Sequence, residues 1–212
     1  MGSYVDSTRL WFGPAAFALF AVGTFAIGAI TPGYSHISQT VSELGEAGAP
    51  GQFAFSILLC LVAVGLCICA GGMARALREL GCSSLPAYFV AAMAVSCAGV
   101  GIFSFPHPLH NIFGLSETVG LQAPLAAALA CRSQLRAKQI SRFSFIMYGV
   151  VLFAIAVNLM PLVRPPDLWP VVKPILGVVQ RFLFVSWFLW CAVFAMLLGA
   201  QAGRTIGSNT SK

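Results

Sequence analysis

Three residues of the segment that follows Pro106 have the spacing of a single helix face. His110, Gly114 and Glu117 stand at positions i, i+4 and i+7. An imidazole and a carboxyl group on one side of a helix can move protons on a substrate or hold its polar group. The candidate acid or base residues are therefore His110 and Glu117, with Glu43 of an earlier segment as a third. The residues alone do not specify a reaction.

A second polar group lies in the segment Tyr34-Ser-His-Ile-Ser-Gln-Thr-Val-Ser-Glu-Leu-Gly45. Its residues fall into two stripes at helical spacing, an apolar one of Ile37, Val41 and Leu44 and a polar one of His36, Thr40 and Glu43. The pattern predicts a short interfacial helix that ends near Gly45, since glycine is a common helix stop. A helix this short is marginal alone, so we expect it to dock on the rest of the molecule.

Arg181 is the cation best placed to pair with Glu117. Ionisable groups inside an apolar segment usually face the protein interior and have a partner. One interpretation is a structural ion pair that joins two helices, with histidines at a polar interface. The other is a site at which these groups converge on a ligand. It predicts eight ligand-binding residues: His36, Ser38, Ser42, Glu43, His110, Glu117, Gln180 and Arg181.

The histidine spacing gives little support to metal or haem chemistry. His107-Pro-Leu-His110 contains a proline and fits no standard zinc signature. A two-haem membrane cytochrome would need paired histidines at both faces. We therefore predict no metal and no cofactor. A metal held by the histidines and a carboxylate stays a lesser alternative, as does a serine nucleophile, although no nucleophile elbow is present.

The composition identifies the elements that must position these residues. Hydrophobic residues make up 58% of the 212 residues and charged residues 8%, against about 25% charged residues in a soluble domain. A spanning helix needs about 20 apolar residues, and six such segments lie at about 10–30, 53–74, 87–105, 112–131, 143–162 and 174–199. The predicted fold is all-α, one integral membrane bundle of six transmembrane helices over residues 1–203. A disordered cytoplasmic tail is expected over 204–212.

Basic residues are concentrated on one side of this predicted topology. The N-terminus, the second and fourth loops and the C-terminus carry Arg9, Arg75, Arg78, Arg132, Arg136, Lys138, Arg142, Arg204 and Lys212. The positive-inside rule therefore predicts that both termini are cytoplasmic, in a bacterial cell membrane. All three histidines and four of the six acidic residues then fall on the outer side. The net charge of +6 indicates topology and contact with anionic lipids rather than nucleic-acid binding.

The chain resembles a known family in three places: Tyr34 to Gly45, Phe105-Pro with His110 downstream, and Gly177-Val-Val-Gln-Arg181. These motifs are similar to those of the prokaryotic membrane family called domain of unknown function 998. The resemblance implies six membrane helices and covers most of the chain. Gln180 departs from it, because the family tends to have an acidic residue before the final arginine. The Ile-Ser motif after the first helix also resembles, more distantly, the eukaryotic damage-regulated autophagy modulators. Neither resemblance implies a reaction.

The leading functional hypothesis is recognition of a lipid or other amphiphile at the outer-leaflet side, with or without chemistry on it. One alternative is a small transporter or channel, which would need a polar path through the cytoplasmic half. Another is a structural or accessory subunit without a ligand. The expected partners are membrane lipids, and a homo-oligomer or a partner membrane protein is compatible with the sequence.

Overall fold

The computed structural model describes residues 7–209, with side chains over 8–201, and this part of the chain is all-α. The α-helices are α1 Ser7–Leu10, α2 Phe12–Ile30, α3 Gln52–Glu79, α4 Leu85–Ile102, α5 Pro108–Gly120, α6 Ala123–Cys131, α7 Lys138–Asn158, α8 Met160–Val163, α9 Trp169–Val172 and α10 Leu176–Asn209. Short 3-10 helices cover η1 Ser42–Gly45, η2 Leu135–Ala137 and η3 Lys173–Ile175. The tail predicted over 204–212 overlaps the end of α10, and residues 210–212 lie outside the described part.

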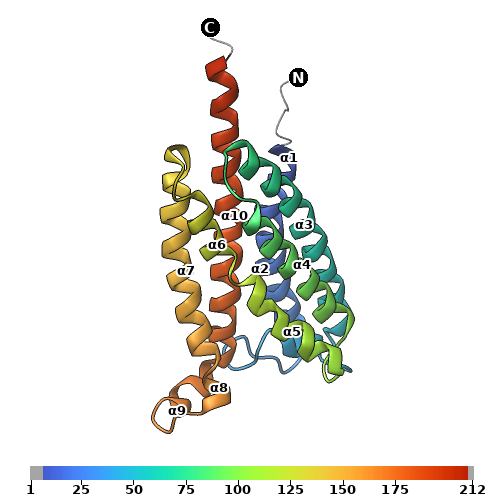
Figure 1. Cartoon of the computed structure of the whole chain (residues 1–212). Helices are drawn as coiled ribbons and strands as arrows, with labels where there is room; N and C mark the ends of the chain where they lie inside the picture. Colours follow the sequence, from blue (N-terminus) through green and yellow to red (C-terminus); the bar gives the residue numbers. More distant parts are fainter. Residues whose placement is uncertain (1–6, 210–212) are drawn as a thin grey trace.

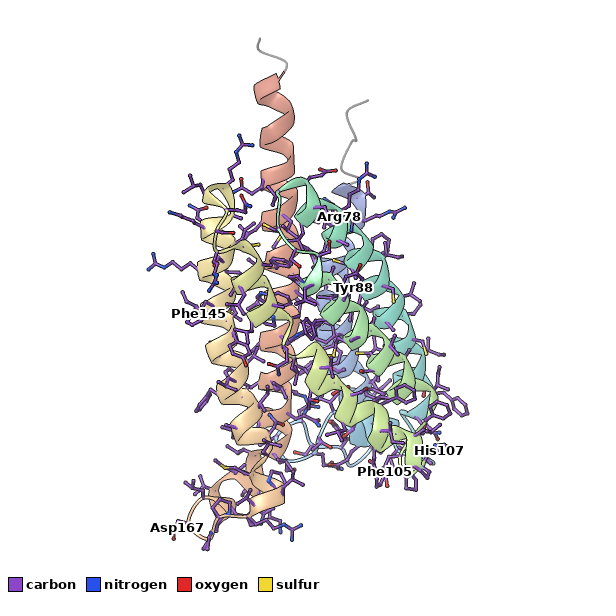
Figure 2. The ribbon with its side chains drawn as sticks, in the orientation of Figure 1. Arg78, Tyr88, Phe105, His107, Phe145 and Asp167 are labelled. Carbon is purple, nitrogen blue, oxygen red and sulfur yellow. The ribbon has the colours of Figure 1, made fainter. Side chains whose placement is uncertain are left out.

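Six helical segments are long and apolar enough to cross a membrane, which confirms the predicted fold class. They run over Thr8–Ile30, Gln52–Glu79, Leu85–Ile102, Pro108–Cys131, Leu135–Val163 and Trp169–Gln201. The beginning of the first and the end of the last lie at the same end of the bundle (Figure 1). Arg78 lies toward that end, whereas Phe105, His107 and Asp167 lie at the opposite end (Figure 2).

The fourth spanning segment is broken between α5 and α6. Pro124 stands in the first turn of α6, where its missing N–H removes a helix hydrogen bond and its ring crowds the preceding turn. The carbonyl of Gly120 accepts a hydrogen bond from the Trp187 indole at 3.0 Å. Backbone groups within a bilayer need such partners, because water is absent there. The break lets α5 run in its own direction, beside α4 (Figure 1).

The half of the bundle nearer the termini is filled by aromatic side chains of α10. Trp187, Trp190 and Phe194 are completely buried, and the Trp190 indole donates to the Ser144 hydroxyl at 3.1 Å. Beside this cluster, at the wall of the cavity described below, Phe188 stacks on Phe20 of α2 with ring centroids 4.5 Å apart. This packing fixes α10 against α2 and α7, and leaves the opposite half of the bundle as the place for a cavity.

The loop between α2 and α3 contains less helix than its two stripes predict. Its regular part is the 3-10 helix Ser42–Gly45, and a turn occupies 36–38. Polar side chains of the loop bond to its own backbone instead: Gln39 accepts from the Ser35 amide at 2.8 Å and Glu43 from the Thr40 amide at 3.0 Å. Such local bonds compete with helix formation. The loop remains docked through Val41 and Leu44, both buried.

Candidate functional site

A cavity of about 350 Å³ lies within the half of the bundle that faces away from the termini. It is enclosed by α2, α3, α4, α5, α10 and the first loop, and its walls combine four phenylalanines with a small set of polar groups. The lining residues are Phe20, Val41, Ser42, Phe55, Leu59, Cys97, Val100, His110, Asn111, Gly114, Leu115, Glu117, Gln180, Phe184 and Phe188. An apolar cavity with a few convergent polar groups is the usual form of a small-molecule site.

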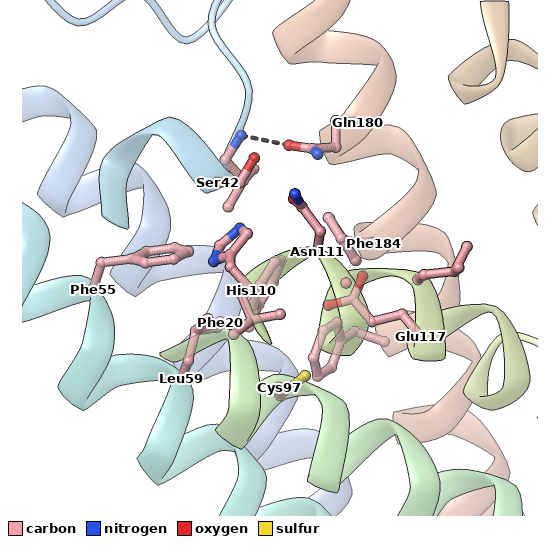
Figure 3. A pocket seen from close by; sticks show the side chains of 15 residues that line it. Phe20, Ser42, Phe55, Leu59, Cys97, His110, Asn111, Glu117, Gln180 and Phe184 are labelled. Atoms are coloured by element: carbon pink, nitrogen blue, oxygen red, sulfur yellow. Dashed lines mark hydrogen bonds between the residues drawn. The ribbon is translucent and has the colours of Figure 1, made fainter. Parts of the chain in front are cut away.

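A second cavity, which we call the vestibule, adjoins the first. Its volume is about 290 Å³, and it is lined by Thr40, Ser42, Glu43, Glu46, Phe105, His110 and Asn111. Ser42, His110 and Asn111 line both spaces. Ser42, Asn111 and Gln180 point toward one another in Figure 3, with the His110 ring beside them. These groups form a polar rim between the vestibule and the aromatic interior.

Helix α5 supplies most of the polar lining. It begins at Pro108, where the His107 Nδ1 atom accepts a hydrogen bond from the Leu109 amide at 3.1 Å. His110, Gly114 and Glu117 all line the cavity, as their spacing on one helix face predicts. A Cβ atom built on Gly114 would meet no other atom within 4 Å. The glycine therefore leaves open space in the cavity wall between the imidazole and the carboxyl group.

His110 is held in one orientation by the backbone. Its side chain is 7% exposed, and Nδ1 lies 2.8 Å from the carbonyl oxygen of Phe103. Because a carbonyl can only accept, Nδ1 donates its proton in this bond. The second ring nitrogen, Nε2, is then free to accept a hydrogen bond or a proton. Since His110 lines both cavities, this nitrogen is available to a group that occupies the rim.

The predicted ion pair between Glu117 and Arg181 is wrong. Arg181 donates to the carbonyl oxygens of His36 at 2.9 Å and of Gln39 at 3.0 Å, and it also donates to the Tyr34 hydroxyl. The first loop thus binds the guanidinium group that an ion pair with Glu117 would need. In the described part of the chain, the Glu117 carboxyl group has neither an ion pair nor a hydrogen bond, and it lines the cavity.

The beginning of α10 holds the first loop through three residues. Gly177 lies against the loop backbone, where a Cβ atom would stand 2.7 Å from the His36 carbonyl oxygen. The Gln180 side chain accepts from the Val41 amide (Figure 3), which leaves its NH2 group at the cavity. Arg181 binds the carbonyls from the same side of the helix. Gly177, Gln180 and Arg181 therefore form a latch, and only Gln180 of the three lines the cavity.

Glu43 and Ser42 belong to the vestibule wall. The Glu43 carboxylate accepts from the Gln39 amide group at 3.0 Å and from the Thr40 hydroxyl at 2.8 Å. The Ser42 hydroxyl lies 3.2 Å from that of Thr40. These hydrogen bonds brace the 3-10 helix Ser42–Gly45. The role of Glu43 is thus partly structural, and its carboxylate faces the space through which a ligand would reach the rim.

Three of the eight predicted residues, His36, Ser38 and Arg181, line neither cavity. The His36 ring stacks on Phe25 of α2 at a centroid distance of 4.8 Å. Burial, and to a lesser extent the charge of Arg181, lower the pKa of His36 below its ordinary value. Ser38 is exposed. Within residues 8–201, no three metal-ligating side chains converge.

The prediction from sequence missed Asn111 and the aromatic walls. Asn111 follows His110 directly and lines both spaces; its amide at the start of an apolar segment was the available indication. Phe20, Phe55, Phe184 and Phe188 come from three different helices. Nothing distinguishes them in sequence from the other 13 of the 17 phenylalanines, because only tertiary packing brings them together.

A comparison with protein families gives one match. The family model described as "Protein of unknown function (DUF998)" matches residues 13–197. These residues include both cavities and every residue of the latch. No curated protein and no solved structure matches the chain.

Proposed function

Because the chain belongs to the DUF998 family of multi-pass membrane proteins, whose description carries no activity, we propose its function from the cavity: it binds an amphiphile at the outer side of the cell membrane. In this proposal both termini are cytoplasmic, and the vestibule opens to the outer surface. The concentration of basic residues at the terminal end supports this orientation.

The observation that carries the proposal is the joining of a polar rim to an aromatic interior. Ser42, His110, Asn111 and Gln180 offer hydrogen-bonding groups at the boundary of the two spaces. The walls beyond them are mainly apolar, and one lining residue, Leu115, is 71% exposed on the lipid-facing surface. An amphiphile would therefore place its polar group at the rim or just inside it, and its apolar chain out past Leu115 toward the lipid.

The packing of the other half favours binding over transport. A transporter needs a polar path that continues from the cavity toward the terminal end. There, Trp187, Trp190 and Phe194 are completely buried, and the buried Ser144 hydroxyl bonds to Trp190. We therefore propose a binding site that is open to one side of the membrane.

The proposal can be tested with a photoreactive n-decanol carrying a diazirine, applied to the full chain in lipid nanodiscs. Wild-type protein should be labelled in the peptides that contain α5 and the start of α10. Gly114→Leu should remove this labelling, because its side chain enters open cavity space.

Gly149→Leu is the matched control. Gly149 also has no atom within 4 Å of a built Cβ, but it lies on the exposed side of α7 and lines neither cavity. It should label like the wild type. Equal labelling of α5 in wild type and Gly114→Leu, or labelling spread evenly over all lipid-facing helices, would overturn the proposal.

A further inference from the structure

The charge distribution around the cavity restricts the kind of polar group that it can accept. The residues that line the cavity and the vestibule include three carboxylates, Glu117, Glu43 and Glu46, and neither lysine nor arginine is among them. Arg181, the cation expected to pair with Glu117, donates instead to loop carbonyls and to the Tyr34 hydroxyl. A phosphate, sulfate or carboxylate would find no charge partner here, and like charges in an apolar space repel strongly.

Glu117 lacks the partner that its position calls for. It is the tenth residue of α5, about 13 Å from the start of the helix at the usual rise of 1.5 Å per residue. Acidic residues at membrane depth normally pair with another group. Among the described residues the Glu117 carboxyl group has no such partner, and the space it faces is the cavity. A bound cation would fill this role.

The remaining walls are suited to the same kind of group. Phe20, Phe55, Phe184 and Phe188 line the cavity, and aromatic faces attract ammonium ions through their quadrupole, most strongly where water is excluded. His110, 7% exposed, has Nδ1 bonded to a carbonyl, so that Nε2 of the neutral ring is an acceptor. At the entrance, Glu43 and Glu46 would raise the local concentration of cations.

We propose that the ligand of this site is a monocationic amphiphile, an ammonium group on an apolar chain, with Glu117 as its counter-ion. This inference rests on the proposed function and names its ligand class. The ammonium lies between Glu117 and the phenylalanine rings, and the chain extends past Leu115 toward the lipid. No group is transferred and no bond is broken.

The experiment is competition against the photoreactive decanol in nanodiscs of zwitterionic lipid. Three competitors share one chain length and differ in charge: decyltrimethylammonium, n-decanol and decane-1-sulfonate. The ammonium and sulfonate groups keep their charges at every pH used. We expect decyltrimethylammonium to prevent photolabelling of α5 at the lowest concentration, and the sulfonate to need the highest concentration. In Glu117→Gln the advantage of the ammonium over decanol should fall by about 30-fold or more, as expected when one partner of a buried charge pair is removed.

The outcomes separate the two proposals. If α5 is labelled and Gly114→Leu removes the labelling, but the sulfonate or decanol competes as well as the ammonium, the cation inference fails and amphiphile binding stands. If no labelling of α5 occurs, amphiphile binding itself fails. Gly149→Leu serves as the folding control, since Gly149 lines neither cavity and its variant should preserve the preference for the ammonium. An ammonium advantage retained in Glu117→Gln would overturn the role of Glu117.

Discussion

His36 and His110 are both histidines of the end opposite the termini, and their rings have different surroundings. His110 keeps Nε2 available at the rim while Nδ1 bonds to Phe103. His36 stacks on Phe25, and both of its ring nitrogens are buried without a hydrogen-bond partner in the described structure. A protonated His36 ring would carry a positive charge near Arg181, and its N–H groups would have no hydrogen-bond acceptor. Burial first, and this neighbouring charge second, therefore lower the pKa of His36.

This lowered pKa predicts an acid-sensitive stability. In the pH range around the ordinary value of about 6.5, the unfolded chain binds more protons at His36 than the folded protein does. The neutral ring therefore makes its full contribution to the free energy of unfolding above that value. This contribution is lost as the pH falls from the ordinary pKa toward the lowered pKa of the folded protein. The melting temperature of wild type in nanodiscs should decrease from about pH 7.5 to about pH 5.5. His36→Phe, which keeps the stacking and removes the titration, should give a flatter profile. Identical pH profiles for the two proteins would contradict this role.

The residues of the site show which contacts the sequence can predict. The period of α5 brings His110, Gly114 and Glu117 to one wall, because helical spacing is a local property. The partner of Arg181 is not local. Charge complementarity suggested Glu117, but carbonyl oxygens of the first loop accept the hydrogen bonds of the guanidinium instead. Every residue has a backbone carbonyl, so the sequence does not indicate which carbonyls will bind an arginine. The phenylalanine walls were missed because only tertiary packing brings them together, whereas the Asn111 amide, next to His110, was an indication that the sequence did offer.

At the scale of elements, α10 and the first loop depend on each other. The Val178 amide donates to the Ile37 carbonyl at 3.1 Å, and Arg181 bonds to the carbonyls on either side of it. Gly177 permits this approach because it has no side chain. The loop in turn supplies Val41 and Ser42 to the cavity wall. The latch therefore positions part of the site although its arginine does not touch the cavity.

Gly177→Ala should be destabilising. The added methyl group would stand 2.7 Å and 2.9 Å from the carbonyl oxygens of His36 and Ile37, which belong to backbone and cannot simply rotate away. We expect a loss of about 1–3 kcal/mol, the usual range for overpacking. Thermal unfolding in nanodiscs measures the loss, with Gly149→Ala as the control because its Cβ meets open space. A Gly177→Ala protein as stable as wild type would show that the loop is not held in this way.

The helices themselves were predictable to a large degree, and the loop was not. Long apolar stretches identify candidate spans because lipid leaves helices as the only way to satisfy the backbone, and six helices of the described chain are long and apolar enough to cross a membrane. The break at Gly120 depends on Pro124 together with the indole of Trp187, a contact across helices. The loop has helical stripes, but local side-chain bonds such as that of Glu43 to the Thr40 amide reduce its regular part to Ser42–Gly45.

For the whole molecule, the two halves of the bundle have opposite characters. The half near the termini is packed with the fully buried Trp187, Trp190 and Phe194 of α10, and the other half contains the cavity, the vestibule and the latch. A bundle built in this way has one closely packed half, in which aromatic side chains of α10 fill the space between helices, and one half in which polar groups line a cavity. The functional proposals both depend on which side of the membrane that second half faces.

The orientation can be tested with single introduced cysteines and a membrane-impermeant maleimide on intact cells. Ser38 is exposed in the first loop and Arg136 is exposed at the opposite end of the bundle, so the two sites should lie on opposite sides of about 30 Å of hydrocarbon. Ser38→Cys should react in intact cells, and Arg136→Cys only after permeabilisation, because basic loops are retained in the cytoplasm. The seven native cysteines are first replaced, since Cys67 is exposed. Labelling of Arg136→Cys in intact cells would put the cavity on the cytoplasmic side, and an amphiphile of the outer leaflet could not then be its ligand.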